Sequence, residues 1–468
     1  MTQKQQVHGY KRVFRAFVSP VYTRKFKKNV TRLVSQLIVF KHLHLFSMST
    51  HKRQYDVVKG LLNGKQVHTL TSQQIQAVVL GKSGIATRDS KRLYVLHDGC
   101  DIRKPSSRDM EYIGDVLSLS KQVVAGYKSM NSVAVDPDKQ SLDLVFHELY
   151  SNKHPHFVSQ ESLQNPALLS PESIALSKSG QAINSKILYQ KSITASHTAL
   201  KSDNPSVELT HISDREFDDV EHFEFISGLN DRFITRLKLS RLSNESQAVL
   251  TPKGKVSKRL APIKLCEKRV LTHTYEYSLL KLTIKGKHYS RVRVRMEWEA
   301  LVLNLNTYWV LRITLFTSSK KAIFANPMLL ITNGLIDSLS TAIEIYHAYL
   351  MRFKIEFVFK FLKQNLGLET IQIRDWHSIK NLLALVFFMV GYFKELETDL
   401  KKDPMAQFIA DLALSKGKVT EYFLLKGIEK LVSFMQVKEL IDQAIITEQQ
   451  IDELFGRIGI QMNFIRSS

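Results

Sequence analysis

The stretch YHAYLMRFKIEFVFKFLKQNLGLE, residues 346–369, combines helical periodicity with four polar groups of different chemistry. Steps of three, four and seven residues separate these groups and return to nearly the same face of an α-helix. The four residues are Tyr349, Arg352, Glu356 and Lys363. A neighbouring face is apolar, with Met351, Ile355, Val358 and Leu362. We therefore predict one helix that packs on a core and presents all four polar groups along one stripe.

The residue types on this stripe suit the binding of metal ions and phosphate. A carboxylate on a rigid helix can ligate a hard divalent cation, because Mg²⁺ takes oxygen ligands from one or two carboxylates together with phosphate. Arginine and lysine beside it can bind phosphate oxygens. A solvated face of an amphipathic helix shows the same charge spacing and stays open as the alternative.

The full pattern, Y-x2-R-x3-E-x6-K, resembles the signature of the insertion-sequence DDE transposases, whose third acidic residue lies in a YREK motif. A second stretch, SDREFDD at residues 213–219, is similar to the segment around the second catalytic aspartate of that family. The resemblance runs from roughly Leu93 to Leu368 and is interrupted by an insertion. It implies a metal-dependent enzyme that cleaves and joins DNA.

Composition indicates a globular protein with a polyanionic partner. The chain has 468 residues, which suggests about two to four domains, and 44% of them are hydrophobic. There are 66 basic and 44 acidic residues, a net charge of +22. This balance favours nucleic acid as the partner, with a membrane surface as the second choice.

Cysteine content and hydropathy bear on the compartment. Two cysteines are too few for a disulfide framework or a Cys-rich zinc site, which fits a reducing cytoplasm. The longest apolar run, LLALVFFMVGYF at residues 382–393, is too short to span a bilayer and predicts a buried helix. We therefore expect a cytoplasmic protein with no membrane partner. The basic N-terminus leaves a transit peptide as a minor alternative.

Residues 1–90 are predicted to form a helical, basic DNA-binding domain. Residues 1–55 contain no Asp or Glu and twelve Lys or Arg. Apolar residues recur at helical spacing from Phe26 to Leu37, and two further helices are expected at 52–62 and 72–80. A basic helical leader without specific DNA contacts is the alternative.

Residues 91–240 alternate between strand and helix patterns. The expected strands are 92–98, 123–135, 141–149, 206–214 and 232–240, and the expected helices are 186–201 and 219–228. A loop rich in Ser, Asn and Pro is expected at 151–182. This order is close to that of an RNase H-like core. We therefore predict an α/β fold whose core has a first part at 91–240 and a second part, with the YREK helix, at 326–370.

Residues 241–325 are predicted to be a β-rich insertion in that core. The clearest strand is RVRVRM, in which Arg291, Arg293 and Arg295 alternate with apolar residues and share one face. A strand at 279–284 would pair with it through a turn around Gly286. The arginine face would bind DNA phosphates; a solvated sheet face is the alternative.

Residues 371–468 form a helical C-terminal region in our prediction. Four helices are expected, at 377–398, 404–415, 418–436 and 447–455. The resemblance implies that this region contributes dimer contacts and binds DNA ends.

Three carboxylates from distant segments form the predicted catalytic and metal site: Asp98, Asp214 and Glu356. Two metal ions ~3.5–4 Å apart can activate the attacking oxygen and stabilise the leaving oxygen of a phosphodiester. Carboxylates suit this role because Mg²⁺ and Mn²⁺ prefer oxygen ligands. We favour Asp98 over Asp101 because it ends an apolar strand.

The rivals of Asp214 are Asp218 and Asp219, and the D-R-E match selects Asp214. By the same resemblance Tyr349, Arg352 and Lys363 would contact DNA phosphates, and Arg215 would support the metal or the DNA end. Relatives carry a tryptophan that stacks on a flipped base, about 21 residues before the YREK tyrosine. Here that position is Met328, and Trp309 is a candidate without positional support.

The predicted function is that of a cut-and-paste DNA transposase, with double-stranded DNA as partner, Mg²⁺ or Mn²⁺ as cofactor, and a homodimer on DNA. Its expected location is the cytoplasm, at the nucleoid when bound to DNA. A metal-dependent nuclease on the same fold and a catalytically decayed DNA-binding protein are the alternatives.

Overall fold

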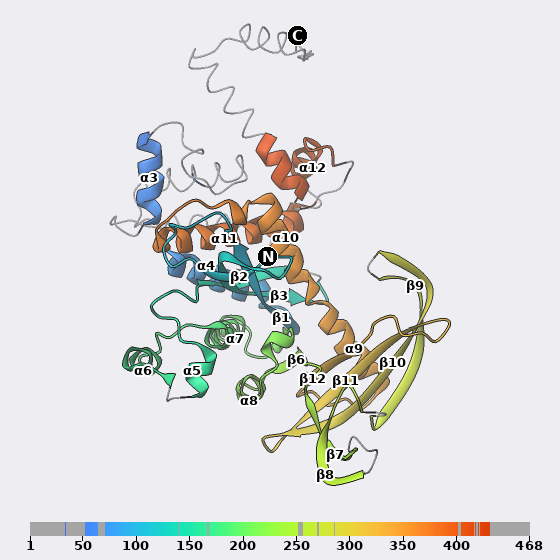
Figure 1. Cartoon of the computed structure of the whole chain (residues 1–468). Helices are drawn as coiled ribbons and strands as arrows, with labels where there is room; N and C mark the ends of the chain where they lie inside the picture. Colours follow the sequence, from blue (N-terminus) through green and yellow to red (C-terminus); the bar gives the residue numbers. More distant parts are fainter. Residues whose placement is uncertain are drawn as a thin grey trace. The chain divides into compact units, whose positions relative to one another are not determined.

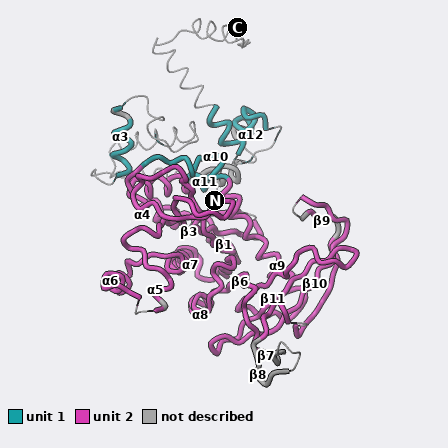
Figure 2. Tube along the Cα trace, viewed as in Figure 1, with its two compact units in different colours: residues 1–69, 361–373, 389–468 teal, residues 70–360, 374–388 magenta. Residues whose placement is uncertain are grey.

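The computed structural model divides the chain into two compact units (Figure 2). Unit 1 comprises residues 1–69, 361–373 and 389–468, and unit 2 comprises residues 70–360 and 374–388. The structure describes residues 33, 52–63, 71–139, 141–165, 168–250, 256–268, 271–284, 286–400, 404–415, 417, 420 and 422–430. The predicted helix at 447–455 lies outside the described residues, and so does the predicted helix at 26–37 except for Leu33. The predicted domain boundaries stay predictions.

Unit 2 is an α/β structure built on a mixed ten-stranded sheet. Five of its strands have the order β4-β3-β1-β5-β6. They are β1 (Arg92–Arg103), β3 (Val123–Asp136), β4 (Ser141–Tyr150), β5 (Glu208–Ser213) and β6 (Arg232–Arg236). β1, β5 and β6 are parallel neighbours, whereas β3 is antiparallel to β1 and to β4. The short strand β2 (Gly114–Leu117) also pairs with β3.

Helices between these strands bury apolar faces against the sheet (Figure 1). α7 (Ser185–Ser202) begins at Asn184, whose side chain accepts a hydrogen bond from the Ile187 N–H, as an N-cap residue does. Its inner face belongs to one large core with α8 (Val220–Gly228). Members from the two helices are Leu188, Tyr189, Ile193, Phe223 and Ile226. On the sheet side this core contains Met130 of β3, Phe146 of β4 and Phe233 of β6.

A second, smaller core lies on α4 (Ser72–Thr87) and the start of β1. α4 begins with a capping box, in which Thr71 and Gln74 bond each other's backbone N–H. The predicted end of this helix at residue 80 is wrong, because the helix continues through Gly81 to Thr87. A glycine in a helix interior costs about 1 kcal/mol relative to alanine, which packing of the helix on β4 outweighs.

Three strands of the predicted insertion, β9 to β11, continue the same sheet. β12 (Met328–Thr332) pairs with β6, and β11 (Asn306–Thr317), β10 (Lys287–Leu303) and β9 (His273–Ile284) follow in order. β7 (Leu242–Leu250) and β8 (Val256–Lys264) form a separate two-stranded sheet. The predicted strand at 279–284 and its turn to the RVRVRM strand are confirmed, with Gly286 at φ +75°.

Two buried charges join β10 and β11 directly. Arg312 donates from Nε and Nη2 to the two carboxylate oxygens of Glu297, at 2.9 and 2.7 Å. The residues are direct cross-strand partners, and both side chains are buried. Arg312 also donates to the backbone oxygens of Leu265 and Lys268, so this pair ties the segment after β8 to the sheet.

Other element boundaries also differ from the predictions. The first strand was predicted to end at Asp98, but β1 continues to Arg103 because its ladder with β3 extends that far. The predicted strand 232–240 ends at Arg236. The predicted loop at 151–182 contains the short helices α5 (Gln160–Gln164) and α6 (Pro171–Lys178).

The apolar run at 382–393 lies in helix α11 (Trp376–Leu400), as predicted. Residues 382–390 are all buried, which explains why this helix has no polar face in its middle. None of the helices in the part of the chain that the structure describes is long and apolar enough to cross a membrane.

The described part of unit 1 is helical. α3 (Lys52–Leu62) matches the predicted helix at 52–62, and α12 (Pro404–Asp411) is shorter than the predicted helix at 404–415. Residues 422–430 are helical around Gly427. A Cβ at this glycine would collide with the backbone of Ile409, so a close approach of two helices requires glycine there.

Candidate carboxylate site

The YREK residues lie on two helices instead of one. α9 (Leu339–Leu350) ends after Tyr349, and α10 (Phe353–Asn365) begins before Glu356. Between them the backbone tightens, with bonds from Arg352 N–H to the Tyr349 carbonyl at 3.0 Å and from Lys354 N–H to the Met351 carbonyl at 2.9 Å. These three-residue bonds are those of a 3₁₀ turn. The prediction of one uninterrupted stripe is therefore wrong.

The turn places Arg352 between two of the predicted site carboxylates. Its Nη1 donates to Asp98 Oδ2 at 2.8 Å, and its Nη2 donates to Glu356 Oε1 at 2.7 Å. The Arg352 side chain is 6% exposed, whereas that of Glu356 is 51% exposed. One guanidinium thus joins β1 to the first turn of α10.

Burial and neighbouring charge make Asp98 an unusual carboxyl group. Burial raises the pKa of Asp98 to about 7, Arg352 opposes this shift, and Asp214 and Glu356 add to it. Burial alone would lower the pKa of Arg352, but Asp98 and its neighbours raise it above the ordinary arginine value. The influence of Asp214 and Glu356 on Asp98 indicates that the three predicted carboxylates lie in one region.

The register of the sheet explains why Asp214 is close to Asp98. His97 on β1 lies opposite Ser213 on β5, so the two aspartates follow at corresponding positions of neighbouring parallel strands. Asp214 Oδ1 accepts a hydrogen bond from the Arg215 N–H at 2.7 Å and thereby begins the short 3₁₀-helix η3 (Arg215–Phe217).

The rival acids make other contacts. Asp101 Oδ2 accepts a hydrogen bond from the Leu117 N–H at 3.3 Å. Asp218 forms an ion pair with Arg241 and accepts the Lys238 N–H. Asp219 caps α8 and pairs with Lys186 at 2.9 Å. Within the described residues, Asp98 and Glu356 are the acids that bind Arg352.

The remaining predicted DNA contacts differ in accessibility. Tyr349 is 1% exposed, and within the described residues its hydroxyl has no hydrogen-bond partner. Arg215 is exposed. Lys363 lies further along α10, in unit 1, where its Nζ is 3.0 Å from Glu369 Oε1. Met328 begins β12 and Trp309 lies on β11, and both are half-buried.

The arrangement of the acids is not that of a ready metal site. Among the described residues, no group of three or more His, Cys, Asp or Glu side chains is close enough to hold a metal ion. The donor chemistry suits Mg²⁺ or Mn²⁺, since three carboxylates supply oxygen ligands. The guanidinium of Arg352 occupies the hydrogen-bonding positions of two of them.

The comparison with known proteins gives no identity. No protein-family model matches the chain, and no curated protein matches it. Function is therefore inferred from the residues and their geometry.

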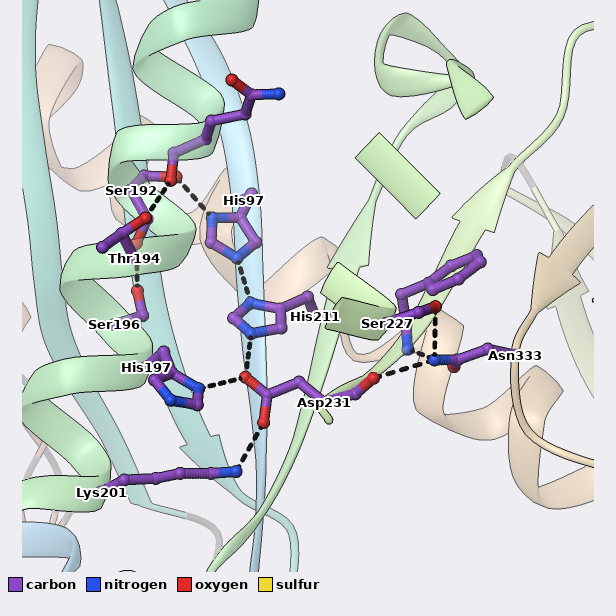
Figure 3. Close-up of polar contacts among 12 residues, drawn as sticks. His97, Ser192, Thr194, Ser196, His197, Lys201, His211, Ser227, Asp231 and Asn333 are labelled. Atoms are coloured by element: carbon purple, nitrogen blue, oxygen red, sulfur yellow. Dashed lines mark hydrogen bonds and ion pairs between the residues drawn. The ribbon is translucent and has the colours of Figure 1, made fainter. Parts of the chain in front are cut away.

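A buried polar chain lies behind the site and was not predicted from the sequence (Figure 3). His97 Nε2 is 2.9 Å from His211 Nδ1, and His211 Nε2 is 3.2 Å from Asp231 Oδ2. Asp231 also pairs with His197 at 2.7 Å and with Lys201 at 2.7 Å. These contacts join β1, β5, α7 and the residue just before β6.

One arrangement of protons satisfies this chain. The Asp231 carboxylate only accepts, so His211 donates from Nε2 and must accept at Nδ1 when it is neutral. His97 then donates from Nε2 and accepts at Nδ1, where Ser132 Oγ lies at 2.7 Å. Burial lowers the pKa of both histidines, which keeps them neutral. His97 directly precedes Asp98, and the alternation of a strand directs the two side chains to opposite faces.

The arginine strand has the alternation that its sequence predicts. Val292, Val294 and Met296 are buried, and the arginines between them are exposed or half-buried. On that face Arg295 Nη2 lies 2.6 Å from Glu276 Oε1, and Arg293 lies 3.8 Å from the same carboxylate. Part of the positive charge is therefore neutralised within the sheet.

Proposed function

We propose that this protein is a DDE transposase that cleaves DNA ends and joins them to target DNA with the help of divalent metal. The observation that carries the proposal is that Arg352 bonds both its neighbour Glu356 and Asp98, which lies 254 residues from Arg352 in the sequence. Asp214 stands at the corresponding position of the next strand. These are the three acids that the YREK and D-R-E resemblances select.

The strand topology supports an RNase H-like core. The order β4-β3-β1-β5-β6, with three parallel strands and antiparallel pairing of β3, is the order expected for such a core. In this arrangement Asp98 lies on the central strand and Asp214 follows its neighbour. The β-rich segment that separates β6 from α9 would be the insertion seen in the family.

Asp98, Asp214 and Glu356 would hold Mg²⁺ or Mn²⁺. When bound, such an ion supplies positive charge to the phosphodiester oxygens that gain negative charge in the reaction. β1 and β5 fix the direction of the two aspartates, and the sheet excludes water from one side of Asp98. Glu356 is exposed, whereas Asp98 and Asp214 are half-buried, so arriving DNA would meet Glu356 first.

The charge distribution supports DNA as the partner. The chain carries a net charge of +22, and phosphate contacts provide most of the affinity of DNA-binding proteins. Arg291, Arg293 and Arg295 would bind phosphates from one sheet face, and Tyr349, Arg352, Lys363 and Arg215 would serve near the cleaved end. We further propose a homodimer on DNA and a cytoplasmic location at the nucleoid.

A cleavage assay tests the proposal. The protein is incubated with Mg²⁺ and with duplex DNA that carries the genomic sequences flanking its coding region. Cleavage at the repeat ends followed by joining to a second duplex supports a transposase. Cleavage without joining would assign the protein to the nucleases. Binding without cleavage would indicate a DNA-binding protein without catalysis.

A further inference from the structure

Arg352 already has two acidic partners in the DNA-free structure. Each end of its guanidinium faces a different carboxylate, at 2.8 Å to Asp98 and 2.7 Å to Glu356. Two charge-assisted hydrogen bonds to separate carboxylates are strong contacts in a buried setting. Asp98 and Glu356 are also two of the three acids that would hold a divalent ion.

We propose that Arg352 is an internal cation that competes with divalent metal for Asp98 and Glu356. In the DNA-free protein the guanidinium neutralises both acids and keeps metal affinity low. This inference rests on the proposed function, because it takes the two carboxylates as metal ligands. It also accounts for the absence, among the described residues, of a group of acids close enough to hold a metal ion.

The exposure of the two acids shows where the exchange would begin. The Glu356 side chain is 51% exposed and the Asp98 side chain is 18% exposed. The bond to Glu356 can therefore open to solvent first, while the bond to Asp98 holds Arg352 in place. The third nitrogen of this guanidinium, Arg352 Nε, is buried and has no hydrogen-bond partner among the described residues.

Phosphate is the anion that can draw Arg352 away. A planar guanidinium binds phosphate oxygens in the same two-pronged way as carboxylates. Arg352 Nε, which has no hydrogen-bond partner among the described residues, could then bind an oxygen of an arriving DNA end. Transfer of Arg352 to phosphate would release Asp98 and Glu356 to metal, so that metal binding and DNA binding favour each other.

Calorimetry tests this inference. The full-length protein is titrated with Mn²⁺ at pH 8.5 in the absence of DNA, and the heat of binding is measured. The alkaline pH favours the ionised form of the carboxyl groups. We expect Arg352→Gln to bind Mn²⁺ roughly tenfold more tightly than the wild type, within the usual range of coupling between ligands. Asp98→Asn added to this variant should remove the gain. An Arg352→Gln variant that binds Mn²⁺ no more tightly would overturn the inference.

Arg236→Gln is the matched control for general electrostatics. Arg236 is close enough to lower the pKa of Tyr349, but within the described residues no ion pair joins it to either acid. An equal gain in Mn²⁺ affinity in this variant would show that any nearby charge matters and would also overturn the inference.

Arg352→Lys decides the question if the glutamine variant fails to fold. Lysine keeps the charge but has one nitrogen for two separated oxygen atoms. Tighter Mn²⁺ binding than in the wild type supports competition, and unchanged binding contradicts it. Because no DNA is present, these outcomes are independent of whether the wild type cleaves DNA.

Discussion

His97 Nε2 lies 2.9 Å from His211 Nδ1 inside the sheet, one residue before the candidate ligand Asp98. The contact joins neighbouring parallel strands, and Asp231 accepts the hydrogen bond at its far end. Because Asp98 lies next to His97 on β1 and Asp214 directly follows β5, this polar chain fixes the backbone that carries both acids.

Asp231→Asn should destabilise the protein by about 3 kcal/mol, because a buried carboxylate with two histidine partners and one lysine partner is lost. Its pKa lies near 2, held down by its hydrogen bonds to His211, Lys201 and His197 against the effect of burial. Urea denaturation measures the change. Asp138→Asn, which breaks an exposed pair with Arg92, should cost less than about 1 kcal/mol. Equal effects would show that the chain contributes no more than a surface contact.

Glu356→Gln should abolish DNA cleavage and leave binding of DNA ends largely intact. A metal-ligating carboxylate acts on the transition state, whereas DNA affinity comes mostly from basic residues. Cleavage assays and gel-shift titrations measure the two effects separately. Glu344→Gln is a control, since Glu344 is exposed on α9 and pairs with Arg92. Full cleavage by the Glu356 variant would refute the site assignment.

Asp98→Asn should eliminate cleavage, and Asp101→Asn should reduce it less. The reason is the contact of Asp98 with Arg352, whereas Asp101 accepts a backbone N–H at the edge of β2. Single-turnover cleavage rates compare the two variants. The opposite order of rates would make Asp101 the ligand.

Replacement of Arg291, Arg293 and Arg295 by Gln should weaken DNA binding and flatten its dependence on salt. Each lost phosphate contact should lower the slope of log K against log salt by about 0.9. The buried valines on the other face are unchanged, and circular dichroism can verify the fold. Glu276→Gln should strengthen binding, because it frees Arg293 and Arg295. Unchanged affinity and slope in the triple variant would identify a solvated face.

Stability should fall as the pH decreases below about 6.5, in part because of His147. Burial and the charge of Lys380 lower the pKa of His147 to about 3, so the folded protein keeps it neutral while the unfolded chain binds a proton. The unfolded state then binds more protons, and one such group costs roughly 2–3 kcal/mol between pH 6.5 and 4.5. His147→Gln should reduce the pH slope of urea midpoints. His377 is exposed, and His377→Gln is the control. Equal pH slopes in both variants and the wild type would contradict the assignment to His147.

Local patterns in the sequence determined many elements correctly. The alternation of arginine and valine predicts β10, since neighbouring strand residues face opposite sides. Helical periodicity predicts α7 within one residue at each end. The apolar run at 382–393 predicts a buried helix because it has no polar face. Each of these signals lies within a few residues of the structure that it specifies.

The site itself depends on partners that no local pattern contains. The sequence indicated Asp98, Asp214 and Glu356 by motif, but the tertiary structure decided that Arg352 stands between two of them. The turn between α9 and α10 contains no glycine or proline, so the local sequence does not predict a break there. In the folded protein this turn places the Arg352 guanidinium against Asp98, a partner that the local sequence does not contain.

The histidine chain shows the same division. His97 and His211 lie on strands whose patterns the sequence revealed, and each could equally have been an isolated buried residue. Their contact requires parallel pairing of β1 and β5 in one register, across 114 residues. The sequence by itself determined where most strands and helices lie, because that depends largely on neighbours in the chain. The tertiary structure decided which polar groups share a buried space, because only there does the cost of removing them from water select their partners.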